Sequence, residues 1–555
     1  MALLSQRLLP RATVSHAALP EALTSPSGWL LAPAKRDSWQ LPDQFCFLNE
    51  THQVASPTFW NTGATTYLWH YNLHYFDYLL SPVGLAHPES ASQWIDRWVS
   101  ENPPFSGRGW EPYPTSLRVV NWLKFAWQNQ PLTKGQTISL ALQVRWLYAN
   151  LEYHLLANHL FTNAKTLVFA GLAFAGDEAQ AWLKRGLKIL LVQIPEQFLS
   201  DGGHFERCPM YHGILLEDLL DLLNLIQAST STWKTFNVKI QADICQLQTL
   251  ITAKWDALWT WYEAMRHPDG HFPLFNDSAY GIAPEFSAVL EYAKRLGVSV
   301  STDKIVFPSL WHAQDSQFVR LEYGPWLLFW DIGGPAPSYQ PGHAHAGTLG
   351  FELSLVGQRL IVDTGISTYE PNPQRLLERS TKAHNTLTVD DLNSSEVWSS
   401  FRVAHRAKTF DYYQHIDDLC IEIGCSHNGY ARFSDLGFHQ RRLQLASTRL
   451  TVVDQITGRG CHQLESRFHL APGLQIKVAS NSTKAEILNT SGTILCTLQV
   501  DGALIKSEFT TYYPEFGKGL SIACLIVYME TLLPHTIQMV FAYESFPGNS
   551  LANNV

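Results

Sequence analysis

The spacing of apolar residues changes once along this chain, near residue 310. From about residue 65 to 300, apolar residues recur at helical spacing, as in SLALQVRWLYANLEYHLLANHL and GILLEDLLDLLNLIQ. After about residue 315 the repeat shortens to two residues, as in LGFELSLVGQRLIVDTG and RRLQLASTRLTVVDQITG, with polar turns between the segments. The sequence therefore predicts a helical half followed by a half built of antiparallel strands.

The length of 555 residues exceeds what one hydrophobic core usually holds, so at least two domains are expected. We predict an extended N-terminal segment over 1–60 and antiparallel helix pairs, closing into a ring or bundle, over 61–310. A large antiparallel β-sandwich is expected over 311–555. The predicted fold class is thus α+β and multidomain.

Charge and hydropathy exclude two broad classes of protein. The formal net charge of -9 argues against a nucleic-acid-binding protein, which usually has a basic face. No run of about 18 consecutive apolar residues occurs, so no membrane span is predicted. Pro10, His16 and Pro20 interrupt the apolar residues near the N-terminus, so no signal peptide is recognised and a cytoplasmic location is expected. The oligomeric state stays open.

Several segments of the helical half carry polar residues that could line a binding site. The segment YHLLANHLFTNAK contains Asn158 and His159 near the end of an apolar helical pattern, where they could project into a cleft. A lone histidine or asparagine in a helix is more often a surface or a satisfied core residue. The segments NLHYFDYLL and YPTSLRVVNW offer further cleft residues, although helix packing explains the aromatic ones equally well; these candidate substrate-binding residues are His74, Tyr75 and Arg118.

The segment DGGHFERCPMYHGILLEDLL concentrates titratable groups just ahead of a helix. Gly202 and Gly203 mark a turn, and Pro209 restricts the backbone where the next helix begins. A capped helix start with a solvated face is an equally good explanation. The polar and titratable residues of this segment are His204, Glu206, Arg207, Tyr211 and His212, of which Glu206 and Arg207 are candidate substrate-binding residues.

Histidines also gather in the strand-rich half. In YQPGHAHAGTLGFEL, His343 and His345 are two residues apart, so they would share one face of a strand. Asp363 and His384 lie on later strand-like segments. Two histidines and a carboxylate from neighbouring strands suit tetrahedral Zn²⁺ completed by water, and a hydrogen-bonded histidine cluster without metal is the alternative.

Taken together, these segments resemble the heparinase II/III family of polysaccharide lyases. The likeness runs in order from LWHYNLHYFDYL through NHLFTNAKTLVFAGLAF and DGGHFERCPMYHGILLEDLLDL to PGHAHAGTLGFEL and RSTKAHNTLTVDD. The subgroup it resembles is encoded with bacterial exopolysaccharide genes. The resemblance implies an (α/α) toroid, an antiparallel β-sandwich with a cleft between them, and a lyase that acts on an acidic polysaccharide.

The resemblance also implies roles for particular residues. The implied catalytic residues are Asn158, His159, Tyr211 and His343. The implied ligands of a structural zinc ion are His345, Asp363 and His384. Many members of the family read HAHAD where this chain reads HAHAG, so Gly347 replaces an aspartate. If that aspartate supports the metal or a histidine, we expect weaker support here, and the change puts zinc in more doubt than catalysis.

The chemistry of β-elimination explains these residue types. The C5 proton of a uronate is a poor acid while the carboxylate is ionised, so hydrogen bonds at the carboxylate must stabilise the enolate-like intermediate. Asn158 can donate such a bond, and His159 or Arg207 could add positive charge. Tyr211 could remove the C5 proton and protonate O4 when both lie on one side of the sugar ring. His343 is the better base when they lie on opposite sides.

Two rival functions remain at this point. A glycoside hydrolase needs two facing carboxylates about 5–10 Å apart, and the candidates Glu206, Asp269 and Asp277 form no persuasive pair. A non-catalytic protein that binds glycan or assists its assembly in an exopolysaccharide system is the second rival. The presence together of Asn158, Tyr211 and His343 argues against it.

Overall fold

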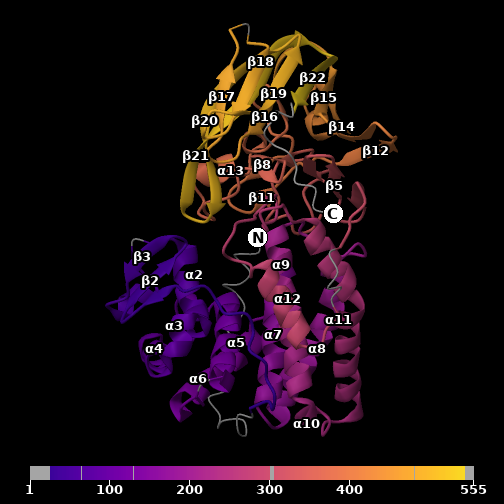
Figure 1. Cartoon of the computed structure of the whole chain (residues 1–555). Coiled ribbons are helices and arrows are strands. Elements are labelled where there is room, and N and C mark those ends of the chain that lie inside the picture. Colours follow the sequence, from indigo (N-terminus) through magenta and orange to yellow (C-terminus); the bar gives the residue numbers. More distant parts are fainter. Residues whose placement is uncertain (1–24, 64, 129, 300–304, 481, 544–555) are drawn as a thin grey trace. The chain divides into compact units, whose positions relative to one another are not determined.

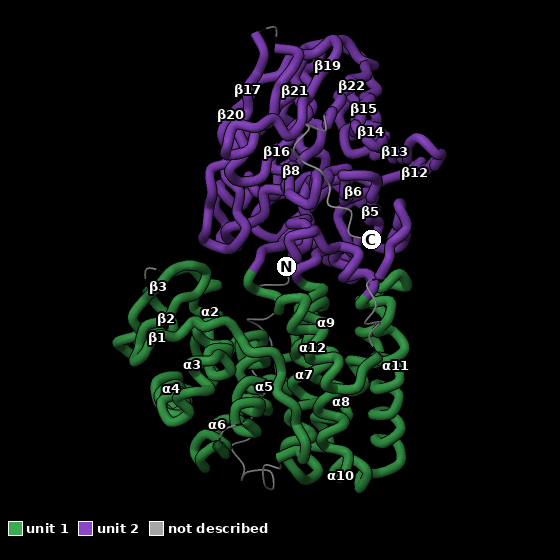
Figure 2. The backbone as a smooth tube through the Cα atoms, viewed as in Figure 1, with its two compact units in different colours: residues 1–202, 211–259, 281–303 green, residues 203–210, 260–280, 304–555 purple. Residues whose placement is uncertain are grey.

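The computed structural model describes residues 25–299 and 305–543 except residues 64, 129 and 481, so the first 24 residues of the predicted N-terminal segment lie outside the described residues. Helices occupy the first part of the chain and strands the last (Figure 1). The chain divides into two compact units (Figure 2). The helical unit comprises residues 1–202, 211–259 and 281–303, and the β unit comprises residues 203–210, 260–280 and 304–555.

The helical unit begins with a small antiparallel sheet inside the segment predicted to be extended, in the order β1-β2-β3. Its strands are β1 (Trp39–Gln40), β2 (Gln44–Phe47) and β3 (Glu50–Gln53). The longer helices that follow are α2 (Tyr67–Tyr75), α4 (Pro88–Glu101), α5 (Pro112–Gln128), α6 (Lys134–Ala149), α7 (Ala157–Ala173), α8 (Asp177–Gln197), α9 (Pro209–Ala228), α11 (Val238–Ala264) and α12 (Phe286–Arg295). Short helices are η1 (Pro57–Trp60), η2 (Asp77–Leu80), α3 (Pro82–Ala86), η3 (Arg108–Trp110) and α10 (Thr230–Trp233). Within the described residues, no helix is long and apolar enough to cross a membrane.

Close contact between α7 and α8 fixes the position of the helix that carries Asn158. A Cβ atom on Gly171 would lie 2.6 Å from the Cβ atom of Leu183, and one on Gly186 would lie 2.7 Å from the carbonyl oxygen of Ala164. Both distances are shorter than van der Waals contact, so only glycine fits at these two crossings. The two helices can therefore approach each other more closely than larger residues would permit.

A buried network of charges joins α5, α7 and α9. Asp221 Oδ2 accepts hydrogen bonds from Lys124 Nζ at 2.5 Å and from Lys165 Nζ at 2.6 Å. Lys165 Nζ also donates to Asp218 Oδ1 at 2.5 Å. Burial alone would raise the pKa of Asp221, but the two lysines outweigh burial and hold this pKa below its usual range. The network thus pairs charges that would be costly to bury singly.

The β unit contains three larger antiparallel sheets. Their strand orders are β4-β5-β6-β7-β8, β20-β21-β16-β9 and β12-β13-β14-β15-β22-β19-β18-β17. The strands of the first sheet are β4 (Leu310–Ala313), β5 (Phe318–Tyr323), β6 (Trp326–Asp331), β7 (Phe351–Leu355) and β8 (Gln358–Ile361). Those of the second are β9 (Leu387–Val389), β16 (Cys461–His469), β20 (Leu504–Glu515) and β21 (Lys518–Leu532). Those of the third are β12 (Thr409–Ile416), β13 (Cys420–His427), β14 (Leu436–Ala446), β15 (Arg449–Gly458), β17 (Gln475–Val478), β18 (Lys484–Leu488), β19 (Ile494–Asp501) and β22 (His535–Ala542).

One apolar core lies among these three sheets and includes Trp330 of β6, Leu443 of β14 and Leu525 of β21. Along β14 buried residues alternate with more exposed ones, as expected for a strand with one face toward a core. The predicted class, helices followed by an antiparallel sandwich, is therefore confirmed. Short elements that belong to none of these three sheets are β10 (Val397–Trp398), β11 (Arg402–Val403), α13 (Pro373–Glu378), η4 (Thr381–Ala383) and η5 (Gly429–Arg432).

Candidate active site

Asn158 lies at the beginning of α7, and not near the end of a helix as the apolar pattern indicated. The run of apolar residues is broken, because α6 ends at Ala149 and α7 begins at Ala157. The two residues before Asn158 have positive φ angles, 60° at Leu156 and 48° at Ala157. Such conformations are costly for residues with a side chain and gather at functional sites. Asn158 itself is largely buried, with 5% of its surface exposed.

His159 is partly exposed and contacts two side chains. Its Nδ1 lies 3.1 Å from Glu152 Oε1, and its ring centroid lies 4.5 Å from that of Tyr113 at the start of α5. The Tyr113 hydroxyl also hydrogen-bonds the Asn158 side chain. Tyr113 thus touches both predicted residues, although no sequence motif singled it out. Burial, followed by the nearby Asp218 carboxylate, raises the pKa of Tyr113, so this hydroxyl stays protonated at neutral pH.

Tyr211 lies in the first turn of α9 and has 7% of its surface exposed. The neighbouring His212 is a core residue: its Nε2 hydrogen-bonds the Leu258 carbonyl oxygen at 3.1 Å, and burial lowers its pKa to about 3. Burial therefore removes His212 as a candidate acid or base and leaves Tyr211 as the candidate in this turn.

Three predicted substrate-binding residues of the helical unit are buried in its core. Arg118 is fully buried, donates from Nε to Gln143 Oε1 at 2.8 Å, and lies 3.9 Å above the Trp98 ring. His74 is also fully buried; its Nε2 lies 2.9 Å from the Trp60 carbonyl oxygen and its Nδ1 accepts a hydrogen bond from Trp98 at 3.0 Å. The prediction of a cleft position for Arg118 and His74 is therefore wrong, because their polar atoms are satisfied by core groups. Tyr75 is 8% exposed and its ring lies 5.9 Å from that of Tyr113.

Glu206 and Arg207 lie in the β unit and are buried, with 2% and 4% of their surfaces exposed. The Arg207 guanidinium donates to the carbonyl oxygens of Ser316 and Gly334, each at 2.7 Å, and it pairs with Asp331. These bonds commit the guanidinium to protein groups. The prediction that Arg207 binds substrate is therefore corrected: its contacts assign it to holding the chain beside β5 and β6.

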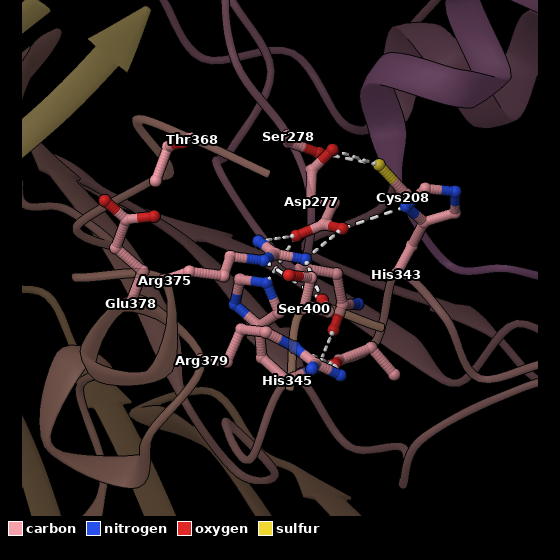
Figure 3. A network of polar contacts seen from close by, with 12 residues as sticks. Cys208, Asp277, Ser278, His343, His345, Thr368, Arg375, Glu378, Arg379 and Ser400 are labelled. Carbon is pink, nitrogen blue, oxygen red and sulfur yellow. Dashed lines mark hydrogen bonds and ion pairs between the residues drawn. The ribbon is translucent and has the colours of Figure 1, made fainter. Parts of the chain in front are cut away.

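In the β unit, one buried carboxylate joins the two histidines of the HAHAG segment. Asp277 Oδ2 lies 2.9 Å from His343 Nδ1, and Asp277 Oδ1 lies 2.7 Å from His345 Nε2. Arg375 of α13 binds the same carboxylate through both terminal nitrogens, at 2.5 and 2.6 Å. Figure 3 shows the Arg375 guanidinium and the His343 ring both directed at Asp277. The arrangement brings together residues up to 98 positions apart in the sequence.

The groups around Asp277 stabilise its ionised carboxylate. Burial would raise the pKa of this carboxyl, but the Arg375 guanidinium and the bonds from His343 and His345 hold it well below its usual range. Burial lowers the pKa of His345 to about 3, so this ring is neutral at ordinary pH and donates from Nε2. His343 differs in exposure: 12% of its side-chain surface is accessible, against 1% for His345. Of the two histidines, only His343 can therefore meet a substrate.

The HAHAG segment is a loop in the structure and not the strand that its spacing suggested. Hydrogen bonds hold it to the segment that contains Asp277: the Asp277 amide donates to the His343 carbonyl oxygen at 3.1 Å, and the His345 amide donates to Asn276 Oδ1 at 3.1 Å. On its other side, Arg379 donates to the Ala344 carbonyl oxygen at 2.9 Å. Hydrogen bonds from the Asp277 segment and from Arg379, rather than pairing between strands, therefore orient the two histidines.

The predicted zinc ligands were tested against this geometry. His384 Nδ1 lies 2.7 Å from Asp363 Oδ2, and the rings of His345 and His384 lie 5.3 Å apart. Within the described part of the chain, His345 Nδ1 and His384 Nε2 are buried and have no hydrogen-bond partner, which is the state expected of nitrogens able to bind a metal. Asp363 instead supports the far side of His384. Among the described residues, no group of three or more His, Cys, Asp or Glu side chains could hold a metal ion. Zinc binding stays a prediction, which metal analysis of the purified protein would test.

Close packing against His384 explains why residue 347 is a glycine and not the aspartate of the HAHAD pattern. A Cβ atom at this position would lie 2.9 Å from Cγ and 3.0 Å from Cδ2 of His384. His384 is 2% exposed and held by Asp363, so its ring has little space to move. With His384 in this position, no side chain fits at residue 347.

Comparisons with known proteins cover both halves of the chain. The family models described as "Heparinase II/III N-terminus" and "Heparinase II/III-like, C-terminal" match residues 126–294 and 308–531. A heparin-sulfate lyase of Bacteroides stercoris is 27% identical over 272 residues, which is 44% of this chain and 38% of the relative. A heparin-sulfate lyase of Pedobacter heparinus is 24% identical over 265 residues, with the same two shares. The matched region therefore spans less than half the length of these curated relatives.

Solved structures share the fold at low sequence identity. A crystal structure of heparinase III has a TM-score of 0.68 and 14% identity, and the match covers 96% of this chain and 86% of that one. A mutant of heparan sulfate lyase HepC from Pedobacter heparinus has a TM-score of 0.58 and 16% identity, covering 89% and 80%. This likeness supports the fold, a helical toroid followed by an antiparallel β-sandwich. With both family models matched in order, the chain belongs to the heparinase II/III family.

Proposed function

We propose that this protein is a polysaccharide lyase that cleaves a uronic-acid-containing glycan by β-elimination. The observation that carries the proposal is the match of both halves of the chain to one family of lyases. The residues at the positions assigned to catalysis by the resemblance are an amide, a phenol and an imidazole, namely Asn158, Tyr211 and His343. These three groups meet the chemical needs of elimination without a metal-bound water.

The proposed reaction assigns a separate task to each group. Asn158, assisted by His159, donates hydrogen bonds to the uronate carboxylate and stabilises the negative charge that develops when C5 loses its proton. Either His343 or Tyr211 takes that proton, and the electrons of the C5–H bond form the C4–C5 double bond. The C4–O4 bond then breaks, and Tyr211 protonates O4. The product is a chain that ends in an unsaturated uronate.

The substrate is proposed as a class. The two curated relatives are heparin-sulfate lyases, and heparin-type glycans contain uronate. A bacterial acidic exopolysaccharide meets the same chemical requirement. We therefore propose a uronate-containing acidic polysaccharide, with heparan-type chains and acidic exopolysaccharides as the first substrates to assay.

The geometry argues against a glycoside hydrolase. The carboxylates considered for that role are each committed elsewhere: Asp277 is bound by Arg375, and Asp269 is bound by Arg359 at 2.6 Å. Glu206 is 2% exposed. These carboxylates therefore provide no pair of accessible acid and base groups of the kind that hydrolysis requires.

The test is the ultraviolet absorbance of unsaturated uronate while the protein is mixed with a panel of acidic polysaccharides. Tyr211→Phe should reduce the rate by about 10²-fold or more, because a positioned acid or base contributes about 10²–10⁴. Tyr78→Phe is a matched control: Tyr78 is a buried tyrosine of the helical unit whose hydroxyl has no hydrogen-bond partner in the described residues. Binding without any absorbance change on every polymer would refute the lyase and favour a glycan-binding or assembly role.

A further inference from the structure

We propose that Asp277 is a positioning residue that, fixed by Arg375, holds His343 in the tautomer whose Nε2 can accept a proton. The inference rests on the proposed function for the identity of that proton, the one on C5 of the uronate. The orientation of His343 is a property of the protein alone and can be measured without a substrate. Figure 3 shows the contacts of Asp277 with Arg375 and with His343.

The tautomer follows from the chemistry of the Asp277 carboxylate. An ionised carboxylate has no proton to donate, so the ring nitrogen 2.9 Å from its Oδ2 must carry the hydrogen. That nitrogen is His343 Nδ1, and a neutral imidazole protonated at Nδ1 has its lone pair on Nε2. The bond therefore selects the nitrogen that can act as the base and sets the plane of the ring.

Arg375 fixes the direction in which the carboxylate points. Its two terminal nitrogens donate to the two different oxygens of Asp277 and so hold the plane of the carboxylate, as in bidentate arginine–carboxylate pairs generally. The guanidinium is itself held by the Ser400 carbonyl oxygen, which accepts from Nε at 3.1 Å. The rings of Tyr369 and Phe401 lie 5.0 and 5.5 Å from its central carbon. Arg375 also balances the charge of Asp277, so the carboxylate orients His343 without becoming a buried unpaired anion.

A second arginine–aspartate–histidine set in the same unit shows what a purely structural version looks like. Arg441 binds Asp454 through Nε and Nη2, each at 2.7 Å, and His439 Nε2 lies 2.9 Å from Asp454 Oδ1. The other nitrogen of His439 lies 3.1 Å from His427 Nε2, and the His439 side chain is fully buried. His343 differs in reaching the surface, with 12% of its side chain exposed. The same arrangement of arginine, aspartate and histidine therefore leaves His439 inaccessible to solvent and His343 partly exposed.

The first experiment measures the tautomer directly. Full-length protein labelled with ¹⁵N-histidine is recorded by NMR, and the His343 resonances are assigned by their disappearance in His343→Gln. At a pH at which the ring is neutral, we expect His343 to be protonated at Nδ1 and unprotonated at Nε2. A ring protonated at Nε2 alone would overturn the inference. Because no substrate is present, this result stands whether or not lyase activity is found.

The second experiment compares Asp277→Asn with the matched variant Asp454→Asn. In Asp277→Asn, an NH₂ group replaces one of the two oxygens that Arg375 and the two histidines share, so the neutral amide can no longer both pair with Arg375 and fix the hydrogen of His343 on Nδ1. We expect kcat to fall by about 10²-fold with KM within about twofold, because ring orientation is lost while substrate contacts remain. Asp454→Asn should lose stability and keep kcat. An unchanged kcat in folded Asp277→Asn would refute the positioning role; if this variant does not fold, the tautomer of the wild type decides.

Absence of activity in the wild type on every polymer would count against the proposed function and not against the positioning of His343. The two proposals are therefore separable. The tautomer tests the arrangement around Asp277, and the absorbance assay tests what that arrangement is for.

Discussion

Replacing Gly347 with alanine tests whether the loop around the histidines is as tightly packed as the distances indicate. The added Cβ atom would lie 2.9 Å from Cγ and 3.2 Å from Nδ1 of His384, which is closer than carbon atoms pack in folded proteins. Overpacking of this kind costs about 1–3 kcal/mol. If the ring moves to relieve the overlap, its 2.7 Å bond to Asp363 is weakened instead.

A hydrogen bond to a buried carboxylate contributes about 1.5–3 kcal/mol, so both routes lead to a loss of similar size. The two costs are alternatives, and we expect the free energy of unfolding to fall by about 1–3 kcal/mol. For a unit of this size each kcal/mol shifts the melting temperature by roughly 2–4 °C, so the melting temperature should fall by about 2 °C or more.

The assay is thermal unfolding followed by circular dichroism, with Gly342→Ala as the control in the same loop. A Cβ atom on Gly342 would have its nearest neighbours at 3.9 Å, which is ordinary contact, so this variant should melt within about 1 °C of the wild type. Equal melting temperatures for Gly347→Ala and Gly342→Ala would refute the packing argument. The His384 ring would then be free to move, and the glycine in HAHAG would need another explanation.

Two further predictions concern buried charges. Asp221→Asn leaves Lys124 and Lys165 without their shared anion and should lower the free energy of unfolding, measured by urea titration, by about 3–5 kcal/mol. The control Asp243→Asn removes an exposed ion pair with Lys239 and should change this free energy little. Equal losses in the two variants would contradict a stabilising role for the buried network. Burial raises the pKa of Glu352 to about 7 despite the lowering effect of Arg359. Between about pH 4.5 and 7 the folded protein then binds more protons than the unfolded chain, so the free energy of unfolding falls as pH rises. From pH 5 to 7.5, Glu352→Gln should lose less of this free energy than the wild type. Parallel plots of unfolding free energy against pH for the two proteins would refute the raised pKa of Glu352.

The periodicity of the sequence was sufficient to predict the order of helices and strands. Apolar spacing is a local property, and it reports directly on α8, α9, β14 and β15. The break between α6 and α7 was missed because apolar residues continue through the intervening loop. Asn158 consequently appeared at the end of a helix, whereas it begins one after two residues with positive φ. Backbone conformations of that kind leave no mark in a hydrophobic pattern.

The candidate site was only partly predictable, for a different reason. His343 and Tyr211 were identified through family resemblance, but Asp277 was considered only as the carboxylate of a hydrolase. Its role depends on Arg375, which lies 98 residues away and belongs to no recognised motif. Conversely, Arg118 has the chemical character of a substrate-binding residue, and only its full burial shows that it serves the core. Residue type specifies what a group can do, and its neighbours in space decide whether it does so.

The β unit is discontinuous, and this has a consequence for how the protein can be made and divided. Residues 203–210 and 260–280 belong to it but precede all of the strands that form its three larger sheets. During synthesis these segments leave the ribosome before the strands beside which they fold, so the unit cannot be completed in the order in which its residues appear. A fragment that starts at residue 304 would also lack Asp277. The gene therefore has no single cut that yields an intact β unit, and exchange of whole domains between relatives would separate His343 from the carboxylate that orients it.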